Sequence, residues 1–223
     1  MAENRALPER HRILIVDDHP IVREGLDALI SMHKDLEVCG HASSIQEALD
    51  LVETTNPRVA IVDLSLTDGS GISLISELKS RNSPVRTLVS SMHDETMYAE
   101  RSLQAGALGY VNKQEASSRI IEAIHCVLDG KVYLSERMAE RVLRRMVGTG
   151  AKVESGSVDA LSNRELEVFE LLGNGFSSNE IAEKMHLSVK TIQTYRQRIK
   201  QKLLARNSTE LIRLASTWVV QGG

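Results

Sequence analysis

The chain has 223 residues, a formal net charge of −3 at pH 7, 42% hydrophobic residues, 26% charged residues and only 3% aromatic residues. This composition excludes a disordered or collagen-like chain, and the length favours two small domains over one. No apolar run approaches the ~18 residues of a membrane span and no signal peptide is apparent, so we expect a cytoplasmic protein without a membrane partner. Cys39 and Cys126 are too few for a disulfide framework or a cysteine zinc site.

Short apolar runs alternate with amphipathic stretches over the first part of the chain. The apolar runs are typical of buried strands and lie at residues 13–16, 36–39, 59–62, 85–89 and 108–111. The amphipathic stretches have helical spacing and lie at residues 21–33, 45–54, 72–81, 98–105 and 119–128. This alternation predicts an α/β doubly wound domain over residues 12–129, with a five-stranded parallel sheet of the flavodoxin-like type and helices on both faces.

A linker and a wholly helical domain are predicted to follow. Ser135 is a good N-cap for a helix that ends near residue 147, and residues 148–159 are glycine-rich without an apolar period, so residues 130–159 are expected to be a linker helix and a flexible linker. Further helices are predicted at residues 163–172, 178–185, 189–203 and 208–219. Only a tight turn separates the second of these helices from the third. We therefore predict an all-α four-helix domain of the helix-turn-helix type over residues 160–223.

Polar residues follow the predicted strands at their carboxyl ends. Asp17 and Asp18 follow the first strand, Asp63 follows the third, Ser91 ends the fourth, and Lys113 lies just past the fifth. Because these strand ends form the ligand crevice of a doubly wound sheet, we expect the five groups to meet there. Three carboxylates in one crevice repel one another unless a cation intervenes, and a ligand set without His or Cys favours Mg²⁺. Asp63 is the candidate nucleophile toward phosphorus.

In these residues the chain resembles the response-regulator receiver domain. The resemblance covers residues 12–129, and its matching elements are Val16-Asp17-Asp18-His19-Pro20, Val62-Asp63-Leu64-Ser65, Gly71, Ser91-Met92-His93, Ala105-Gly106-Ala107 and Gly109-Tyr110-Val111-Asn112-Lys113. The chain departs from the pattern at Thr67, where many receivers have proline, and at Gln114, where many have a cis-proline.

The receiver resemblance implies a role for each matching polar residue. Asp63 is then the phosphoacceptor, and Asp18 and Asp63 hold Mg²⁺. Asp17 contributes to the metal site through water, and Ser65 contributes its backbone carbonyl. The same resemblance implies that Ser91 and Tyr110 form the switch pair and that Lys113 contacts the phosphate.

Two other interpretations of the acidic residues are weaker. An Asp-Asp pair after a strand is usually a helix cap, but the joint placement of the polar groups after successive strands makes that account improbable. The sharpest enzymatic alternative is a haloacid-dehalogenase-like phosphatase, which needs a second aspartate two residues after its nucleophile, where this chain has Ser65. We therefore expect that the protein is not an enzyme with turnover, and that Asp63 accepts phosphate and loses it slowly.

The predicted helix at residues 189–203 lies in a basic segment of an otherwise acidic chain. No acidic residue occurs between Glu183 and Glu210, whereas that window contains Lys184, Lys190, Arg196, Arg198, Lys200, Lys202 and Arg206. Ile192, Ile199 and Leu203 form an apolar stripe on this helix, and the opposite side carries Lys190, Gln193, Thr194, Gln197 and Gln201. Glutamine and threonine side chains suit base contacts in the major groove, and Lys190, Arg198, Lys200 and Lys202 suit contacts to phosphates.

The same region closely resembles the LuxR-type helix-turn-helix domain over about residues 158–220. The matching segments are Leu161-Ser162-Asn163-Arg164-Glu165-Leu166-Glu167-Val168 through Gly175, Glu180-Ile181-Ala182, Ser188-Val189-Lys190-Thr191-Ile192 and Lys202-Leu203. This resemblance implies base contacts from Gln193, Thr194 and Gln197, and phosphate contacts from Lys190, Thr191 and Lys202. Together the two resemblances identify the chain as similar to NarL/FixJ-type response regulators, and residues 195–198 are most similar to the GacA/UvrY-like subgroup.

The combined resemblance implies a phosphorylation-controlled, DNA-binding transcriptional regulator of a two-component system, which receives phosphate from a sensor histidine kinase. One recognition helix per chain usually needs a partner, so we expect a homodimer on double-stranded DNA or after phosphorylation. Trp218, Val219 and Val220 either serve that dimer contact or cap the domain core. The alternative from another class is a phosphorylation-controlled protein-interaction module whose helical domain binds a protein partner.

Overall fold

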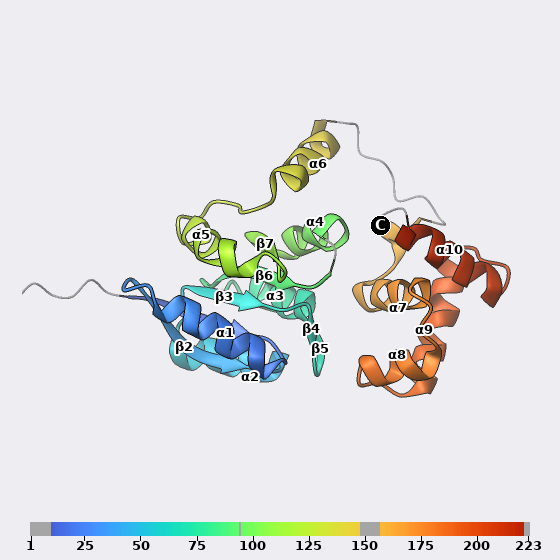
Figure 1. Ribbon diagram of the computed structural model, residues 1–223, viewed down its shortest axis with the longest axis horizontal. Coiled ribbons are helices and arrows are strands. Elements are labelled where there is room, and N and C mark those ends of the chain that lie inside the picture. The colour runs from blue at the N-terminus through green and yellow to red at the C-terminus, as the bar shows by residue number, and fades with distance from the viewer. Residues whose placement is uncertain (1–9, 94, 148–156, 221–223) are drawn as a thin grey trace, which may run out of the picture. The chain divides into compact units, whose positions relative to one another are not determined.

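The computed structural model of the chain describes residues 10–93, 95–147 and 157–220 (Figure 1). The chain divides into two compact units, Met1–Glu140 and Arg141–Gly223. The boundary falls inside the segment 130–159 that the sequence predicts as the linker, and residues 148–156 of that segment lie outside the described residues. Within the described ranges, no helix has the length and apolar character needed to cross a bilayer.

The first unit contains the predicted five-stranded parallel sheet, which confirms the fold class. Its strands are β1 (His11–Val16), β2 (Leu36–Ala42), β3 (Val59–Val62), β6 (Arg86–Ser91) and β7 (Gly109–Asn112), in the order β2-β1-β3-β6-β7. Val16 pairs with Val62, and Val62 pairs with Val89, so the carboxyl ends of the three central strands lie at one level. A two-stranded hairpin of β4 (Ser65–Leu66) and β5 (Gly69–Ser70), which the sequence does not predict, follows β3 directly.

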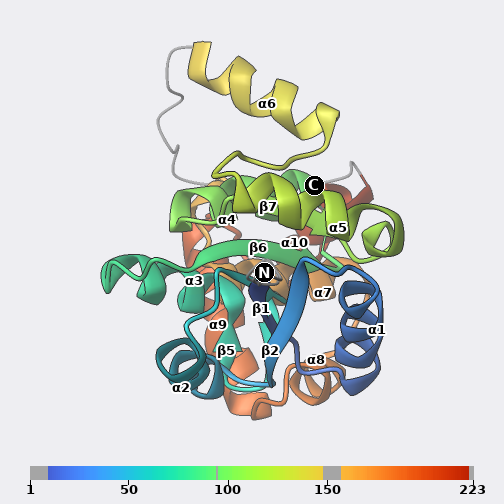
Figure 2. The same cartoon turned by 90° about the vertical axis from the view of Figure 1, so that its left-hand side faces the viewer.

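Helices cover both faces of the sheet, as Figure 2 shows. They are α1 (Pro20–Ser31), α2 (Ile45–Thr55), α3 (Gly71–Ser80), α4 (Glu95–Ala105) and α5 (Ala116–Leu128). Contacts pair α1 with α5, and they join α2 to α3 and α3 to α4. Leu26 and Ile30 of α1 pack with Ile120 and Ile124 of α5 in one aliphatic cluster against the sheet. This burial is what makes the amphipathic stretches helical in the folded chain.

The chain returns to the sheet after α5 before it enters the predicted linker helix. Tyr133 N donates to Leu108 O at 2.9 Å, and Tyr110 N donates to Tyr133 O at 3.0 Å, which makes a parallel bridge beside β7. Helix α6 (Glu136–Val147) then begins after Ser135, whose Oγ accepts from Met138 N at 3.2 Å. Ser135 is therefore the N-cap that the sequence predicts, whereas the bridge at Tyr133 has no sequence signal.

Helices are the only regular secondary structure in the described residues 157–220 of the second unit, as predicted. After a short 3₁₀ turn, η1 (Val158–Ala160), its helices are α7 (Asn163–Gly173), α8 (Ser178–Lys184), α9 (Val189–Lys202) and α10 (Ser208–Val220). The capping boxes of Ser162 with Glu165 and of Ser177 with Glu180 both form, and they start α7 and α8.

Trp218 contacts the core of the second unit. Phe169 is fully buried, and the Trp218 ring packs on it with ring centroids 5.5 Å apart. Of the two roles considered for Trp218, the described contact is therefore the cap on the domain core.

Candidate functional site

The ladder of backbone hydrogen bonds places three charged residues at one edge of the sheet. Asp63 N donates to Val16 O at 2.8 Å, so Asp63 lies directly beside the end of β1, where Asp17 follows. Lys113 N donates to Ser91 O at 2.9 Å, which fixes the residue after β7 against the end of β6. The structure thus brings together residues that are up to about 100 positions apart, because all of them follow parallel strands.

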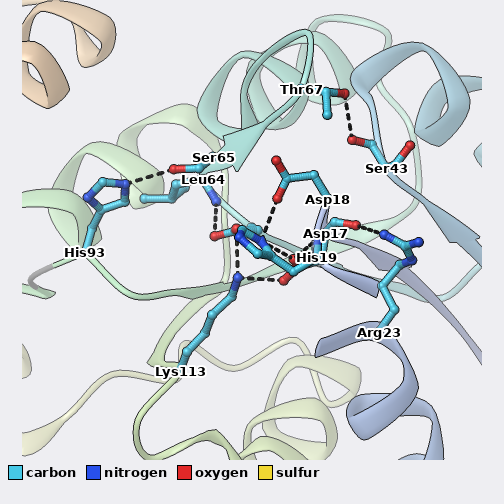
Figure 3. A network of polar contacts seen from close by, with 11 residues as sticks. Asp17, Asp18, His19, Arg23, Ser43, Leu64, Ser65, Thr67, His93 and Lys113 are labelled. Atoms are coloured by element: carbon cyan, nitrogen blue, oxygen red, sulfur yellow. Dashed lines mark hydrogen bonds and ion pairs between the residues drawn. The ribbon is translucent and has the colours of Figure 1, made fainter. Parts of the chain in front are cut away.

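A buried ammonium bridges two buried carboxylates at this edge (Figure 3). Lys113 Nζ lies 2.6 Å from Asp17 Oδ2 and 2.7 Å from Asp63 Oδ2. The side chains of Asp17 and Asp63 are only 3% and 4% exposed. The second Asp63 oxygen, Oδ1, accepts from Leu64 N at 2.7 Å. Both oxygens of Asp63 are therefore oriented by the chain around it.

The charges in this crevice are incompletely balanced. Burial raises the pKa of Asp63, the charge of Asp17 adds to that rise, and Lys113 opposes it. Burial acts to lower the pKa of Lys113, but the attraction of Asp63 and Asp17 outweighs burial and raises it. Lys113 therefore stays a cation, and the carboxylates around it retain an excess of negative charge. Such a site favours a further cation.

Asp18 and His19 complete the acidic cluster. Ligand atoms of Asp17, Asp18, His19 and Asp63 all lie within 4.8 Å of one another. Asp18 Oδ1 is buried and accepts no hydrogen bond, although His19 Nδ1 lies 2.7 Å away. A buried carboxylate oxygen without a hydrogen bond, beside two further carboxylates, fits a hard divalent cation such as Mg²⁺. The sequence pattern gives His19 no role of its own. Its position directly after the aspartate pair is the signal that could have placed it at this site.

The loop between β6 and α4 connects the remaining predicted residues through His93. The His93 backbone N donates to Ser91 Oγ at 3.3 Å, and its carbonyl accepts from Tyr110 Oη at 2.8 Å. The His93 ring nitrogen Nε2 lies 3.1 Å from Ser65 Oγ. Ser91 and Tyr110, the two predicted switch residues, are both buried. Each of them hydrogen-bonds to the backbone of His93 in this loop. Sequence reasoning gave His93 no role, because its contacts depend on how the loop folds back.

Two local features hold the loop after Asp63 in place. A Cβ on Gly71 would lie 2.0 Å from the carbonyl oxygen of Asp63, so only glycine allows this close approach. Thr67, where many receivers have proline, donates from Oγ1 to Ser43 O at 3.1 Å and ties the β4–β5 hairpin to the loop before α2 (Figure 3). At the other departure, Gln114 N donates to Asn112 Oδ1 at 2.9 Å.

Helix α9 presents most of the predicted DNA-binding residues to solvent. Ile192 and Ile199 are fully buried, as the apolar stripe predicts. The exposed residues are Lys190, Gln193, Thr194, Gln197, Arg198, Gln201 and Lys202, whereas Thr191 and Lys200 are half-buried. In the described part of the chain, no hydrogen bond or ion pair engages the side chains of Gln193, Gln197 and Arg198. These three side chains are available to a ligand.

Two cations of α9 are instead engaged with neighbouring helices. Lys202 Nζ donates to Glu165 Oε2 at 2.6 Å, and the side chain of Glu165 is 4% exposed. Burial acts to raise the pKa of Glu165, but the hydrogen bonds from Lys202 and Ser162 outweigh burial and lower it. Arg196 donates to Ser178 Oγ at 2.6 Å. Lys202 and Arg196 thus join α9 to the first turns of α7 and α8.

Comparisons with known proteins match both units. Residues 13–125 match the family described as "Response regulator receiver domain", and residues 159–215 match "Bacterial regulatory proteins, luxR family". The virulence-factor transcription regulator BvgA of Bordetella pertussis is 34% identical over 205 residues, which cover 92% of this chain and 96% of BvgA. The oxygen regulatory protein NreC of Staphylococcus carnosus is 33% identical over 208 residues, which cover 92% of this chain and 96% of NreC.

Solved structures agree with these relatives over both domains. A structure of the RcsB response regulator of Salmonella typhimurium has a TM-score of 0.64 and 25% identity, and the match covers 94% of this chain and 98% of that one. The matches with these proteins therefore span both units of this chain. The chain belongs to the NarL/FixJ-type two-component response regulators, which are transcriptional regulators that join a receiver domain to a LuxR-type DNA-binding domain.

Proposed function

We propose that a sensor histidine kinase phosphorylates this regulator on Asp63, and that phosphorylation controls the binding of its helical domain to double-stranded DNA. The observation that carries the proposal is the ammonium of Lys113, which lies within 2.7 Å of both Asp17 and Asp63 beside the buried oxygen of Asp18. A phosphoryl group adds about two negative charges at neutral pH, so its acceptor needs positive charge close by. We assign the receiver to residues 12–129, the linker to 130–159 and the DNA-binding domain to 160–223.

Each side chain of the acidic site has a distinct part in phosphoryl transfer. An oxygen of Asp63 forms the new bond to phosphorus while the bond from phosphorus to the donor breaks. Lys113 then exchanges its contact with the free carboxylate for one with the phosphoryl oxygens. Asp18, Asp63 and the Ser65 carbonyl would hold Mg²⁺, with Asp17 contributing through water, and the bound ion would neutralise charge on those oxygens. Asp63 accepts phosphate stoichiometrically, so the protein is no turnover enzyme.

The exposed face of α9 is the proposed DNA-reading surface. Gln193, Thr194 and Gln197 are assigned to base edges in the major groove, because their side chains are exposed and carry donors, acceptors or a methyl group. The proposed phosphate contacts come from the hydroxyl and cationic groups that flank this face: Lys190, Thr191, Arg198, Lys200 and Lys202. Among these, the ion pair of Lys202 with Glu165 favours a helix-joining role over a phosphate contact.

We further infer that two copies bind one DNA site. One recognition helix per chain gives limited affinity, and RcsB, which is 26% identical with a TM-score of 0.57, has been solved as two dimers bound to two parallel DNAs. We also place the recognition helix in the GacA/UvrY-like subgroup on the basis of Tyr195-Arg196-Gln197-Arg198. The amide side chains of Gln193 and Gln197 are exposed and make no hydrogen bond within the described part of the chain. They favour DNA over a protein partner as the ligand of α9.

Fluorescence anisotropy of the whole chain on labelled genomic DNA fragments, with and without acetyl phosphate, tests this function. About four phosphate contacts per copy predict that log affinity falls with log salt with a slope near −7 for a dimer. Arg198→Gln removes one contact from each copy, so it should make the slope of the dimer shallower by about 2, whereas Arg213→Gln, which removes an exposed cation from α10, should leave it unchanged. A flat salt response would favour a protein partner instead.

A further inference from the structure

The residues between α5 and α6 are hydrogen-bonded to the first residue of α4. Ser135 Oγ donates to Glu95 Oε2 at 2.6 Å, and Ser135 N donates to Glu95 Oε1 at 3.1 Å. Both oxygens of the Glu95 carboxylate therefore accept a hydrogen bond from Ser135. Ser135 is also the N-cap of α6, because its Oγ accepts from Met138 N, and the Met138 side chain is buried. We call the pair of Glu95 and Ser135 the linker clamp.

The same segment is attached a second time, to strand β7. Tyr133 exchanges backbone hydrogen bonds with Leu108 and Tyr110, on either side of Gly109. A Cβ on Gly109 would lie 3.0 Å from Tyr133 O and 3.1 Å from Tyr133 Cβ, so the glycine allows this close contact. The start of the linker therefore contacts the strand that carries Tyr110, one of the two proposed switch residues.

The linker clamp lies two residues from the loop that touches the candidate site. His93 is held by Ser91 through its backbone N, by Tyr110 through its carbonyl and by Ser65 through its ring. Glu95 follows in the chain as the first residue of α4. In the sequence, His93 is only two positions before Glu95, the residue whose carboxylate accepts from Ser135.

We propose that the linker clamp transmits phosphorylation of Asp63 to the linker helix α6, which leads to the DNA-binding domain. When the Ser91 hydroxyl turns to the phosphoryl group, His93 N loses its acceptor and the loop moves. Glu95 then withdraws from Ser135, and the first turn of α6 becomes less stable. Glu95 and Ser135 are positioning residues, since neither touches the reacting atoms. This inference rests on the proposed function, because it requires a phosphoryl group on Asp63.

Hydrogen exchange of the whole chain, with and without acetyl phosphate and Mg²⁺, tests the linker clamp. In the wild type, phosphorylation should raise exchange of the amides at residues 136–140 by about fivefold, the factor that corresponds to the loss of a hydrogen bond worth about 1 kcal/mol, here the one from Ser135 to Glu95. Ser135→Ala should exchange fast in both states, so that the response to phosphorylation disappears. Glu95→Gln replaces one acceptor oxygen by an amide NH₂ group, which cannot accept from Ser135, and it should reduce the response without removing the serine cap. Ser135→Thr keeps the hydroxyl and should restore the response.

Ser44→Ala is the matched control. Ser44 caps α2 through Glu47 N, so its loss should raise exchange in α2 and leave the response of residues 136–140 intact. Intact mass measured on the same samples separates the two levels of the account. If Asp63 is phosphorylated and the response persists at full size in both Ser135→Ala and Glu95→Gln, the linker clamp is wrong and the proposed function stands. If Asp63 takes up no phosphate, both fail.

Discussion

Replacing Lys113 by methionine removes the one positive charge that the structure places between Asp17 and Asp63, while it keeps most of the apolar stem. The two carboxylates have oxygens within 4.8 Å of each other. At an effective dielectric constant of about 20, their repulsion is at least about 3 kcal/mol. That value agrees with the cost of about 3–5 kcal/mol for breaking a buried ion pair by removing one partner. We therefore expect Lys113→Met to lower the free energy of unfolding of the first unit by about 3–5 kcal/mol without divalent cations.

Added Mg²⁺ should recover much of this loss, because a divalent cation can take over the neutralising role of the ammonium. Urea unfolding followed by far-UV circular dichroism, with EDTA or with excess Mg²⁺, measures both effects. Trp218, the only tryptophan, reports the second unit by fluorescence, and its transition should not move. Lys131→Met, which removes an exposed ion pair with Asp129, should leave both transitions unchanged. Two results would refute this electrostatic reasoning. One is an equal free energy of unfolding for Lys113→Met and wild type in EDTA, and the other is an equal increase of that free energy in both proteins when Mg²⁺ is added.

Three further predictions concern single residues. Burial raises the pKa of Asp63, so the contribution of this carboxyl to the free energy of unfolding is fully present below its ordinary pKa of 3.8 and is lost as pH rises through the raised pKa. The metal-free wild type should therefore lose stability over that pH range, whereas Asp63→Asn should not. Urea unfolding at several pH values measures both. Gly71→Ala forces a Cβ to 2.0 Å from Asp63 O, so it should cost about 1–3 kcal/mol or more by thermal unfolding and slow phosphate uptake. Lys202→Met should lower the free energy of unfolding of the second unit, followed by Trp218 fluorescence, by about 1–2 kcal/mol. The loss is modest because the Lys202 side chain is 40% exposed. Unchanged stability together with weaker DNA binding would instead assign Lys202 to a phosphate contact.

Much of the fold and of the acidic site follows from the sequence, because buried parallel strands are nearly continuous apolar runs and their carboxyl ends meet at one edge. Asp17, Asp63 and Lys113 could be brought together by that rule alone. The helices of the second unit are equally predictable, since Ser162 and Ser177 start capping boxes that the structure forms.

The features that escaped prediction depend on tertiary contacts. The β4–β5 hairpin has strands of two residues, too short for any apolar period, and α4 begins at Glu95, three residues before its apolar pattern. The bridge at Tyr133 uses backbone atoms only, so it leaves no side-chain signal. The pairing of Lys202 with Glu165 joins two charged residues on different helices, whereas the sequence predicts a phosphate contact for that lysine.

We propose that one aspartate, held beside Lys113 at the end of β3, accepts the phosphoryl group. Incubation of the whole chain with acetyl phosphate, followed by intact mass measurement and peptide mapping, tests it directly. We expect a single phosphoryl group on the peptide that contains Asp63, uptake that depends on Mg²⁺, and no uptake by Asp63→Asn. Full labelling of Asp63→Asn, or a wild-type label that maps to another residue, would contradict it.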